Sequence, residues 1–467
     1  MPGSEPVTVQ QVLTVAQMRA AEERLIEAGS SVDALMQVAG RGAAEWVWRV
    51  AGHHPVTVLC GPGNNGGDGY VIAEAIRERG GRVRVIAACE PKTDAARTAR
   101  GLFGGEVLGP EAAAHGDVLV DCLFGSGLAR PLSDEHLALL SSLAAAHRRV
   151  IAIDLPSGVE SDSGALLNQG LPRNALTVAL GAWKPAHFLM PAAPAMGDLR
   201  LVGIGCDAVA GASRVVARPV LHAPAVDAHK YRRGLVAVLG GAMPGASCLA
   251  AEAAQGAGAG YVRLLAEDNG ALPADVVLDR RRTGESLADK RIGAVLVGPG
   301  LGRGDHARVR LEAALASGHP LVLDADALVL LRPGDLAGTA LLTPHEGELA
   351  VLERAFGLAA IGAKPDRAQA LASAVGAVVV AKGPDTVIAS PDGRLAFAHR
   401  ASSWLSVAGS GDVLAGIAAA RLAGRADPFE AACAAVWLHG EAARRLGPAF
   451  TAGMLARRVR EALVACL

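Results

Sequence analysis

A glycine-rich stretch that ends in an acid lies at 408–416, AGSGDVLAG, and opens into an alanine-rich segment. Glycines let backbone N–H groups turn toward one point, and the start of a helix adds its positive end, so such a stretch can hold phosphate charge. Asp412 beside that charge can accept a proton from a hydroxyl while a phosphoryl group is transferred. The other interpretation is structural, with Asp412 as a helix N-cap and the glycines forming a turn.

A second glycine-rich stretch, CGPGNNGGDGY, occupies 60–70. It follows an apolar run and precedes a helical pattern, where backbone amides can approach a ligand. It is neither a dinucleotide fingerprint nor a P-loop. Asn64, Asn65 and Asp68 offer amide and carboxylate oxygens, which suit a hydroxylated ligand or a hard cation. An asparagine-rich turn is the alternative.

Acids also follow two other apolar runs. Asp121 precedes FGSGL at 124–128, and Asp154 lies in IDLPSG. Each acid taken alone can be a helix start, but three such ends on one rim exceed what capping requires. Lys184, in AWKP, has a place near the same rim, although for this residue we expect a solvated lysine.

Short β-branched runs alternate with helix-like stretches along the whole chain, after two helices expected between Val15 and Val50. In the first half the predicted strands are 56–60, 83–88, 118–123, 150–154 and 176–180. In the second half they begin at 235, 261, 294, 320, 340 and 377. This alternation predicts α/β domains with parallel sheets covered on both faces and with sites at the carboxyl ends of the strands.

The alternation lapses after Ile204 through small residues and prolines, which indicates a linker. We therefore expect a first domain at 1–206, a linker at 207–228 and a second domain at 229–467. A length of 467 residues suits two or three domains.

The composition favours small-molecule partners. The 45 basic and 46 acidic residues leave a formal charge of -1, which gives no indication of a nucleic-acid or membrane surface. Seven scattered cysteines without C-x-x-C are typical of buried thiols in a reducing compartment. The chain start has no leader-like pattern and no apolar run could span a bilayer, so we expect a cytoplasmic protein.

The motifs together resemble a known pair of families. GPGNNGGDG, DCLFGSGL and IDLPSG are similar to loops of NAD(P)H-hydrate epimerases. HKYRRG, GPGLG, LDADAL, LTPHEGE, KGPDT and GSGD are similar to loops of ADP-dependent NAD(P)H-hydrate dehydratases, which have a ribokinase-like fold. The motifs cover nearly the whole chain in the order of the fused repair enzyme. The resemblance implies an N-terminal Rossmann-like parallel-sheet domain and a C-terminal ribokinase-like α/β domain.

The resemblance implies roles for residues of the first domain. Substrate would contact Asp154 and two loops, which are Asn64, Asn65, Gly66, Gly67 and Asp68, and Gly125, Ser126, Gly127, Leu128, Ala129, Arg130 and Pro131. Asn65, Asp121 and Ser157 would coordinate a potassium ion, and Asp154 would be the acid or base of epimerisation. Ser126 stands where threonine is common, which keeps the hydroxyl.

For the second domain the resemblance implies a substrate site and a nucleotide site. Ala246, Gly302, His345 and Asp412 would contact the hydrated dinucleotide. The nucleotide ADP would bind to Lys382, Gly383, Pro384, Asp385, Thr386 and Gly411, with a magnesium ion as cofactor. Asp412 would be the base, and a homo-oligomer is expected.

The implied reaction repairs a nicotinamide ring that has gained water at C6. Hydroxide is a poor leaving group, so a phosphoryl group is first transferred from ADP, and elimination of phosphate then restores NADH or NADPH while AMP is released. Only the S epimer would fit this pocket, and the first domain would interconvert the R and S forms.

Simpler roles stay open for several residues. His229, Lys230, Arg232 and Arg233 fit a solvated loop as well as a phosphate contact. His345 taken alone favours a satisfied loop histidine. Helix capping is the simpler account of Asp324 and Asp326.

Two other functions also fit parts of the sequence. The second domain could be a kinase that phosphorylates a stable small molecule, since GSGD alone does not exclude one. The first domain could be a non-catalytic Rossmann-like binding module, although three converging acids argue against it.

Overall fold

The computed structural model of the protein describes residues 10–267 and 272–467. The chain divides into two compact units, Met1–Arg214 and Val215–Leu467. This division falls inside the predicted linker, where the structure places β9 (Ser213–Val215). The predicted domain boundaries themselves stay predictions.

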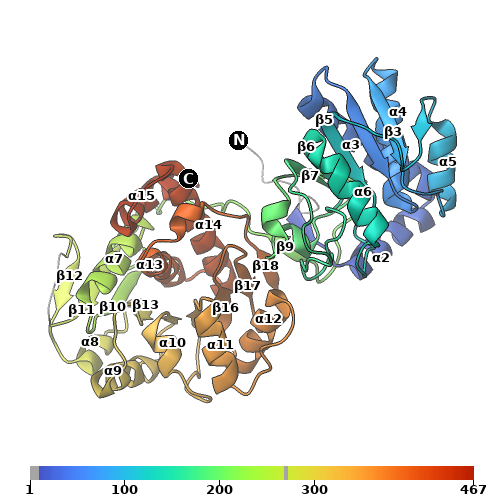
Figure 1. The fold of residues 1–467 in the computed structure, drawn as a ribbon. Helices are drawn as coiled ribbons and strands as arrows, with labels where there is room; N and C mark the ends of the chain where they lie inside the picture. The colour runs from blue at the N-terminus through green and yellow to red at the C-terminus, as the bar shows by residue number, and fades with distance from the viewer. Residues whose placement is uncertain (1–9, 268–271) are drawn as a thin grey trace. The chain divides into compact units, whose positions relative to one another are not determined.

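The first unit is built on a parallel sheet with the strand order β4-β3-β2-β5-β6-β7-β8 (Figure 1). Its helices are α2 (Val15–Glu27), α3 (Val32–Ala51), α4 (Asn64–Glu78), α5 (Asp94–Leu102) and α6 (Asp134–Ala145). The strands are β2 (Val56–Cys60), β3 (Val83–Ala87), β4 (Val107–Leu108), β5 (Gly116–Cys122), β6 (His147–Ile153), β7 (Leu176–Leu180) and β8 (Asp198–Val202). A short strand β1 (Gln11–Val12) pairs antiparallel with β9.

Helices cover both faces of this sheet, as the continuous apolar strands require. One core cluster joins the strands to α2, α3, α4 and α5, and a second cluster joins them to Leu140 and Leu143 of α6. Strand β2 pairs with β3 on one side and with β5 on the other. The connections therefore diverge between β2 and β5, which is where a doubly wound sheet leaves a crevice for a ligand.

The second unit contains a larger sheet with the order β18-β17-β16-β15-β14-β13-β10-β11-β12. Its strands are β10 (Leu235–Leu239), β11 (Tyr261–Leu265), β12 (Val277–Asp279), β13 (Ile292–Val297), β14 (Leu321–Leu323), β15 (Ala340–Leu342), β16 (Val378–Ala381), β17 (Val387–Ala389) and β18 (Leu395–Phe397). Pairing is parallel from β12 to β16 and antiparallel at β16–β17 and β17–β18. The sequence did not predict this antiparallel edge.

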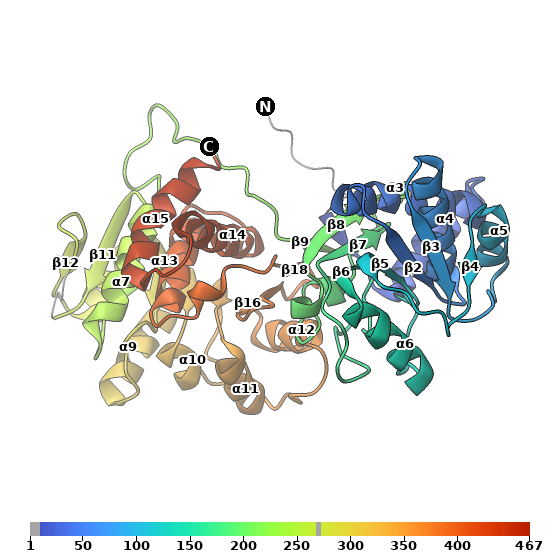
Figure 2. The same cartoon turned by 45° about the horizontal axis from the view of Figure 1, so that its top comes forward.

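Helices lie on both faces of the second sheet (Figure 2). They are α7 (Pro244–Gly256), α8 (Thr283–Leu287), α9 (Asp305–Leu315), α10 (Asp326–Leu330), α11 (Glu346–Ala355), α12 (Lys364–Val375), α13 (Ser410–Ala423), α14 (Pro428–Leu446) and α15 (Ala452–Val464). The connections diverge between β10 and β13, because β10 pairs with β11 on one side and with β13 on the other.

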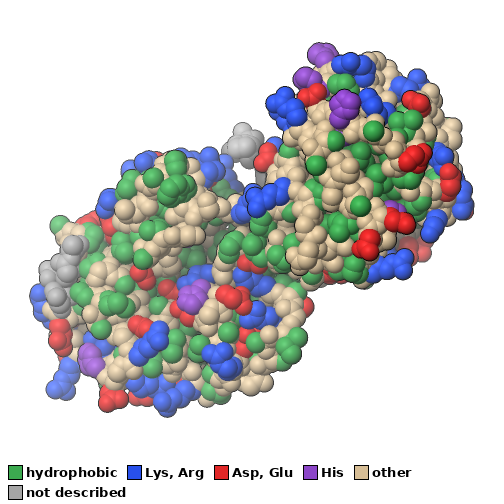
Figure 3. All heavy atoms as spheres, in the orientation of Figure 1, with side chains coloured by type: hydrophobic (Ala, Val, Ile, Leu, Met, Phe, Trp, Pro, Cys, Tyr) green, Lys and Arg blue, Asp and Glu red, His purple; other side chains and the backbone are tan. Residues whose placement is uncertain are grey.

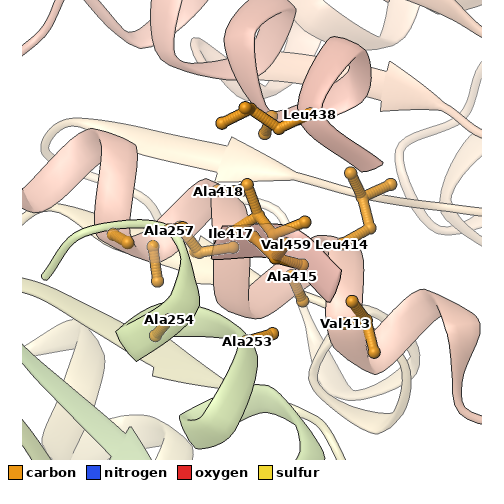
Figure 4. Close-up of a cluster of buried hydrophobic side chains, with 14 of the residues drawn as sticks. Ala253, Ala254, Ala257, Val413, Leu414, Ala415, Ile417, Ala418, Leu438 and Val459 are labelled. Atoms are coloured by element: carbon orange, nitrogen blue, oxygen red, sulfur yellow. The ribbon is translucent and has the colours of Figure 1, made fainter. Parts of the chain in front are cut away.

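Helix α13 is central to the core of the second unit. Its Val413, Leu414, Ile417 and Ala418 are buried together with alanines of α7, with Leu438 of α14 and with Val459 of α15 (Figure 4). Small residues permit this close packing, and a Cβ added to Gly416 would collide with the carbonyl oxygen of Ala250 in α7. The core therefore fixes the axis of α13 and with it the position of its N-terminus.

The surface agrees with the nearly neutral composition. Acidic and basic side chains are interspersed over the face shown in Figure 3. Within residues 10–267 and 272–467, none of the helices combines the length and the apolar character needed to cross a bilayer.

Candidate active sites

The loops that follow β2, β5 and β6 bring the predicted residues of the first unit together. Helix α4 begins at Asn64, so Asn64 to Asp68 form its first turns and present backbone N–H groups. A Cβ added to Gly66 would collide with the carbonyl of Gly61, so a glycine is needed for the helix to start this close to the strand. A Cβ built on Gly125 would lie 3.2 Å from Asn65 Oδ1 and 3.2 Å from Asp154 Oδ2. The two polar groups therefore face the same loop.

Asp154 is held by several donors. It has a left-handed backbone with φ 65°, which is uncommon for a residue other than glycine and is strained. The backbone N–H of Ser126 donates to Oδ2 at 3.0 Å, and the Lys184 ammonium donates to Oδ1. Burial opposes ionisation, but the charge and hydrogen bond of Lys184 outweigh it and lower the pKa of Asp154. Asp154 is therefore held as an anion.

The expectation of a solvated Lys184 is wrong. Its side chain is 1% exposed and forms an ion pair with Asp154. This burial is not predictable from the residues AWKP, because the motif is short and the partner carboxylate lies 30 positions earlier.

Asp121 and Ser157 form a second group beside the same loop. Ser157 donates to Asp121 through its backbone N–H at 3.0 Å and through its hydroxyl at 2.7 Å. The Ser157 hydroxyl also accepts a hydrogen bond from the backbone N–H of Phe124 at 2.9 Å. Burial raises the pKa of Asp121, although the hydrogen bonds from Ser157 and Leu123 oppose the shift.

Asn65 is notable because both amide atoms of its side chain are buried without a hydrogen-bond partner in the described chain. Buried polar groups are nearly always satisfied, so a partner from outside the protein is indicated. Asn65, Asp121 and Ser157 supply only oxygen ligands, which suits a hard cation. The described residues contain no cluster of three or more His, Cys, Asp or Glu side chains that would indicate a transition metal.

Two titratable side chains that lie near Asp154, those of Glu22 and His187, were not predicted from the sequence. Glu22 of α2 is partly buried, and burial raises its pKa, with Lys184 lowering it and Asp154 raising it. His187 donates from Nε2 to the carbonyl oxygen of Asp154 at 2.8 Å. Asp68 was predicted, and its pKa is raised well above the usual value by burial and by Asp154. The helical pattern of this part of the sequence does not predict that Glu22 lies near Asp154.

In the second unit, α13 carries Asp412 in its first turn. The N-cap is Gly409, and it makes no side-chain capping hydrogen bond. No residue in the described part of the chain hydrogen-bonds to the Asp412 carboxylate, so the alternative of a capping role is wrong. Burial and the nearby charge of Asp324 raise the pKa of Asp412 to about 7, although Lys382 opposes the shift.

Lys382 follows β16 and pairs with Asp324, which follows β14. The distance from Lys382 Nζ to Asp324 Oδ1 is 2.7 Å, and Thr343 donates to the same oxygen at 2.7 Å. Lys382 Nζ would lie 3.3 Å from a Cβ on Gly411, so it faces the start of α13. Burial lowers the pKa of Lys382, but the charge of Asp324 outweighs this and raises it. The ammonium stays charged beside Asp412.

The capping account of Asp324 and Asp326 is also wrong. Helix α10 has Ala325 as its N-cap, without a side-chain capping bond. Asp326 instead accepts from the backbone N–H of Gly302 at 2.9 Å and from Arg303 at 2.7 Å. Asp326 thereby holds the GPGLG loop, whose Gly300 lies close to Ala246 at the start of α7.

His345 caps α11. Its Nδ1 accepts from the backbone N–H of Gly347 at 2.9 Å and of Glu348 at 3.3 Å, while the ring is largely exposed. A bridge between His345 and Lys382 places it next to the KGPDT loop. The satisfied loop histidine is therefore what the structure shows, and contact with substrate stays a prediction.

The loop from Lys382 to Thr386 is closed on itself and supported from outside. The Thr386 hydroxyl donates to the carbonyl of Gly383 at 2.8 Å. Lys364, whose role no sequence motif indicates, donates to Asp385 at 2.5 Å. Two basic residues of HKYRRG contact other side chains of the protein. Lys230 Nζ lies 4.9 Å from the ring centre of Tyr261, and Arg232 forms an ion pair with Asp227.

Comparisons with known proteins identify the family. Residues 236–464 match the family model described as NAD(P)H-hydrate dehydratase, and residues 32–186 match that of the YjeF-related protein N-terminus. The bifunctional NAD(P)H-hydrate repair enzyme Nnr of Thermanaerovibrio acidaminovorans is 32% identical over 95% of this chain and 95% of its own. The chain belongs to the NAD(P)H-hydrate repair enzyme family.

Other relatives have the same name. The Nnr enzymes of Gloeobacter violaceus and Escherichia coli are 34% and 32% identical, each over 93% of this chain and over 93% and 87% of their own. The crystal structure of ADP/ATP-dependent NAD(P)H-hydrate dehydratase from Bacillus subtilis with ATP/Mg²⁺ is 26% identical over 54% of this chain and 96% of its own, with a TM-score of 0.47. The predicted family, fold class and bifunctional enzyme are confirmed for this repair enzyme.

Proposed function

We propose that the repair enzyme epimerises the R and S forms of hydrated NADH and NADPH in its first unit. The second unit then dehydrates the S form with ADP and releases AMP and phosphate. The observation that carries this proposal is Asp412, a carboxylate without a capping role in the first turn of α13, with a pKa of about 7. A general base works best when its pKa lies near the operating pH.

In the second unit, Asp412 accepts the proton of the C6 hydroxyl while that oxygen attacks the β-phosphorus of ADP. The bond from the β-phosphorus to the bridging oxygen breaks and AMP leaves. The C6–O bond then breaks, phosphate leaves with that bond's electron pair, and a proton passes from C5 to the departing phosphate, which restores the C5–C6 double bond. Backbone N–H groups at Gly411 and the Lys382 ammonium face the place where phosphoryl charge develops.

The nucleotide is proposed to lie along the loop from Lys382 to Thr386. Lys364 donates to the Asp385 carboxylate and to the carbonyl oxygen of Lys382, so this loop keeps its conformation. Lys382 and Thr343 both donate to Oδ1 of Asp324. A magnesium ion would be held mainly by the phosphates of ADP. Magnesium supplies charge neutralisation to the transferred group.

In the first unit, Asp154 is proposed as the base. The hydroxyl on C6 and the ring nitrogen share one carbon, so removal of the hydroxyl proton lets the C6–N bond open to an aldehyde. The electron pair moves to the nitrogen, where conjugation with the carboxamide spreads it. Closure on the other face of the aldehyde and return of the proton from Asp154 give the other epimer.

The cradle for this substrate is proposed to consist of Asn64 to Asp68 and Gly125 to Pro131, which flank Asp154. A potassium ion held by Asn65, Asp121 and Ser157 would satisfy the unpartnered Asn65 amide oxygen. It would tie the loops after β2, β5 and β6 together, and its charge would favour the ionised form of Asp121.

The decisive test is product analysis with purified S hydrate and ADP. We expect NADH, AMP and phosphate in equal amounts. A lasting phosphorylated product without return of NADH would favour the alternative of a small-molecule kinase. The homo-oligomer and the cytoplasmic location stay predictions.

A further inference from the structure

Lys184 is unusual because its ammonium lies inside the first unit, yet no step of the proposed reaction uses it. The side chain is 1% exposed, so its ammonium cannot reach a substrate. Two acceptors share its protons, the Asp154 carboxylate and the carbonyl oxygen of Leu180 at 2.6 Å. Burying such a pair contributes little net stability, since an apolar pair of similar volume often serves as well. A role beyond stability is therefore indicated.

The main chain around Lys184 is tied to Asp154 as well. The backbone N–H of Lys184 donates to Nδ1 of His187 at 2.9 Å, and His187 Nε2 donates to the carbonyl oxygen of Asp154 at 2.8 Å. These bonds assign the proton to Nε2. Burial and the charge of Lys184 lower the pKa of His187 to about 4, so this neutral tautomer persists over the working range. Lys184 and His187 thus hold both the side chain and the backbone of Asp154.

The two oxygens of Asp154 have different surroundings. Oδ1 accepts from the Lys184 ammonium and from the backbone N–H of Leu180 at 3.4 Å. Oδ2 accepts from the backbone N–H of Ser126 and lies beside Gly125, within the loop proposed to hold substrate. Only Oδ2 is placed to meet a reacting hydroxyl. These contacts together hold the backbone of Asp154 in its strained conformation, with φ 65°.

We propose that Lys184 is the positioning residue of the epimerase, which holds Oδ1 of Asp154 so that Oδ2 is presented, ionised, to the hydroxyl of the substrate. This inference rests on the proposed function of the first unit. The proton moves from the substrate hydroxyl to Oδ2 and returns there, and Lys184 keeps its three protons throughout.

The other charged groups around Asp154 explain why a cation is required there. Burial and the charge of Asp154 raise the pKa values of Glu22 of α2 and Asp68 of α4, and His187 is neutral, so none of the three supplies a positive charge to Asp154. Lys184 is the cation that offsets the burial of Asp154, because its ammonium is the one bonded to the Asp154 carboxylate. Without it, Asp154 would be protonated at higher pH and would lose its function as a base.

The test is Lys184→Met, which keeps the length of the side chain and removes the charge, with exposed Lys92→Met as the matched control. We expect Lys184→Met to lower kcat of epimerisation by about 100-fold or more at pH 7, the usual contribution of a general base. The acid limb of its pH profile should move upward by at least about one pH unit, as expected when an opposite charge beside a carboxylate is removed. KM should change little. Lys92→Met should match the wild type in all three.

A purely structural role would lower the amount of folded protein but leave the acid limb in place. An unchanged kcat and acid limb in folded Lys184→Met would therefore overturn the proposal. Should this variant not fold, Lys184→Arg decides: the charge is kept but the shape differs, so kcat should fall about 10-fold while the acid limb stays. A wild-type kcat in Lys184→Arg would overturn the positioning role. If the wild-type enzyme itself does not epimerise, the proposed function fails instead.

Discussion

Substitution of Asp412 by asparagine tests the base of the dehydratase most sharply. The amide keeps the size of the side chain, and no described residue would lose a hydrogen bond. It cannot accept the hydroxyl proton, so kcat of dehydration should fall by about 100-fold or more, with KM for ADP nearly unchanged. Epimerisation should continue. Asp305→Asn, an exposed acid in the first turn of α9, is the matched control and should have no effect.

The magnitude of the pH effect follows from the pKa of about 7 for Asp412. About a tenth of the carboxyl groups are ionised at pH 6, half at pH 7 and nine-tenths at pH 8, so kcat/KM of dehydration should rise roughly fivefold and then roughly twofold. This acid limb should vanish in Asp412→Asn. A variant that retains more than about a tenth of wild-type turnover, or a wild-type profile that is flat between pH 6 and 8, would show that Asp412 is not the base.

The same pKa predicts an effect on stability. Because the folded pKa of Asp412 is raised above the unfolded value, ionisation destabilises the fold as the pH rises from about 4 through 7. Asp412→Asn removes this cost, so the Tm of the second unit should increase at pH 8 and stay unchanged at pH 4. Thermal unfolding followed at both pH values checks the sign.

Three other changes have definite expected outcomes. Lys382→Ala should raise KM for ADP and move the acid limb of the dehydration pH profile upward, because Asp324 then faces Asp412 without its cation. In steady-state kinetics across pH, an unchanged KM and an unchanged acid limb would show that Lys382 is only structural. Asn65→Ala removes no protein hydrogen bond, so Tm should stay the same while stimulation of epimerisation by potassium is lost; full activity of this variant in potassium-free buffer would count against the cation site. Gly416→Ala should destabilise the second unit by about 1–3 kcal/mol, because its Cβ would clash with Ala250. Gly453→Ala is the control and should be tolerated, because a Cβ there would lie no closer than 3.6 Å to any atom. Equal Tm values for the two variants would contradict the packing of α7 on α13.

Much of the fold was predictable from the sequence because apolar strands alternate with helices in both halves. The strands at 56–60 and 176–180 are confirmed with their predicted bounds, and the two helices between Val15 and Val50 are also confirmed. The antiparallel strands β17 and β18 were missed, since three-residue strands carry almost no periodic signal.

The candidate sites were predictable where motif loops follow strands, because the carboxyl ends of parallel strands meet at one edge of the sheet. Lys184 and Glu22 show where such reasoning ends. Neither belongs to a glycine-rich loop, and each gains its environment from partners far away in the sequence. Asp324 likewise fits a capping residue in the sequence, because its partner Lys382 lies 58 positions later.

The central claim is that one chain performs both reactions, and a time course with an equal mixture of R and S hydrates tests it directly. With ADP in excess, the wild-type enzyme should return all of the nicotinamide to NADH in a single continuous phase. Asp154→Asn should return about half at the same rate and the rest only at the uncatalysed rate of epimerisation. If the wild-type enzyme stopped at half conversion, or if Asp154→Asn consumed both epimers as fast as the wild type, the account would be contradicted.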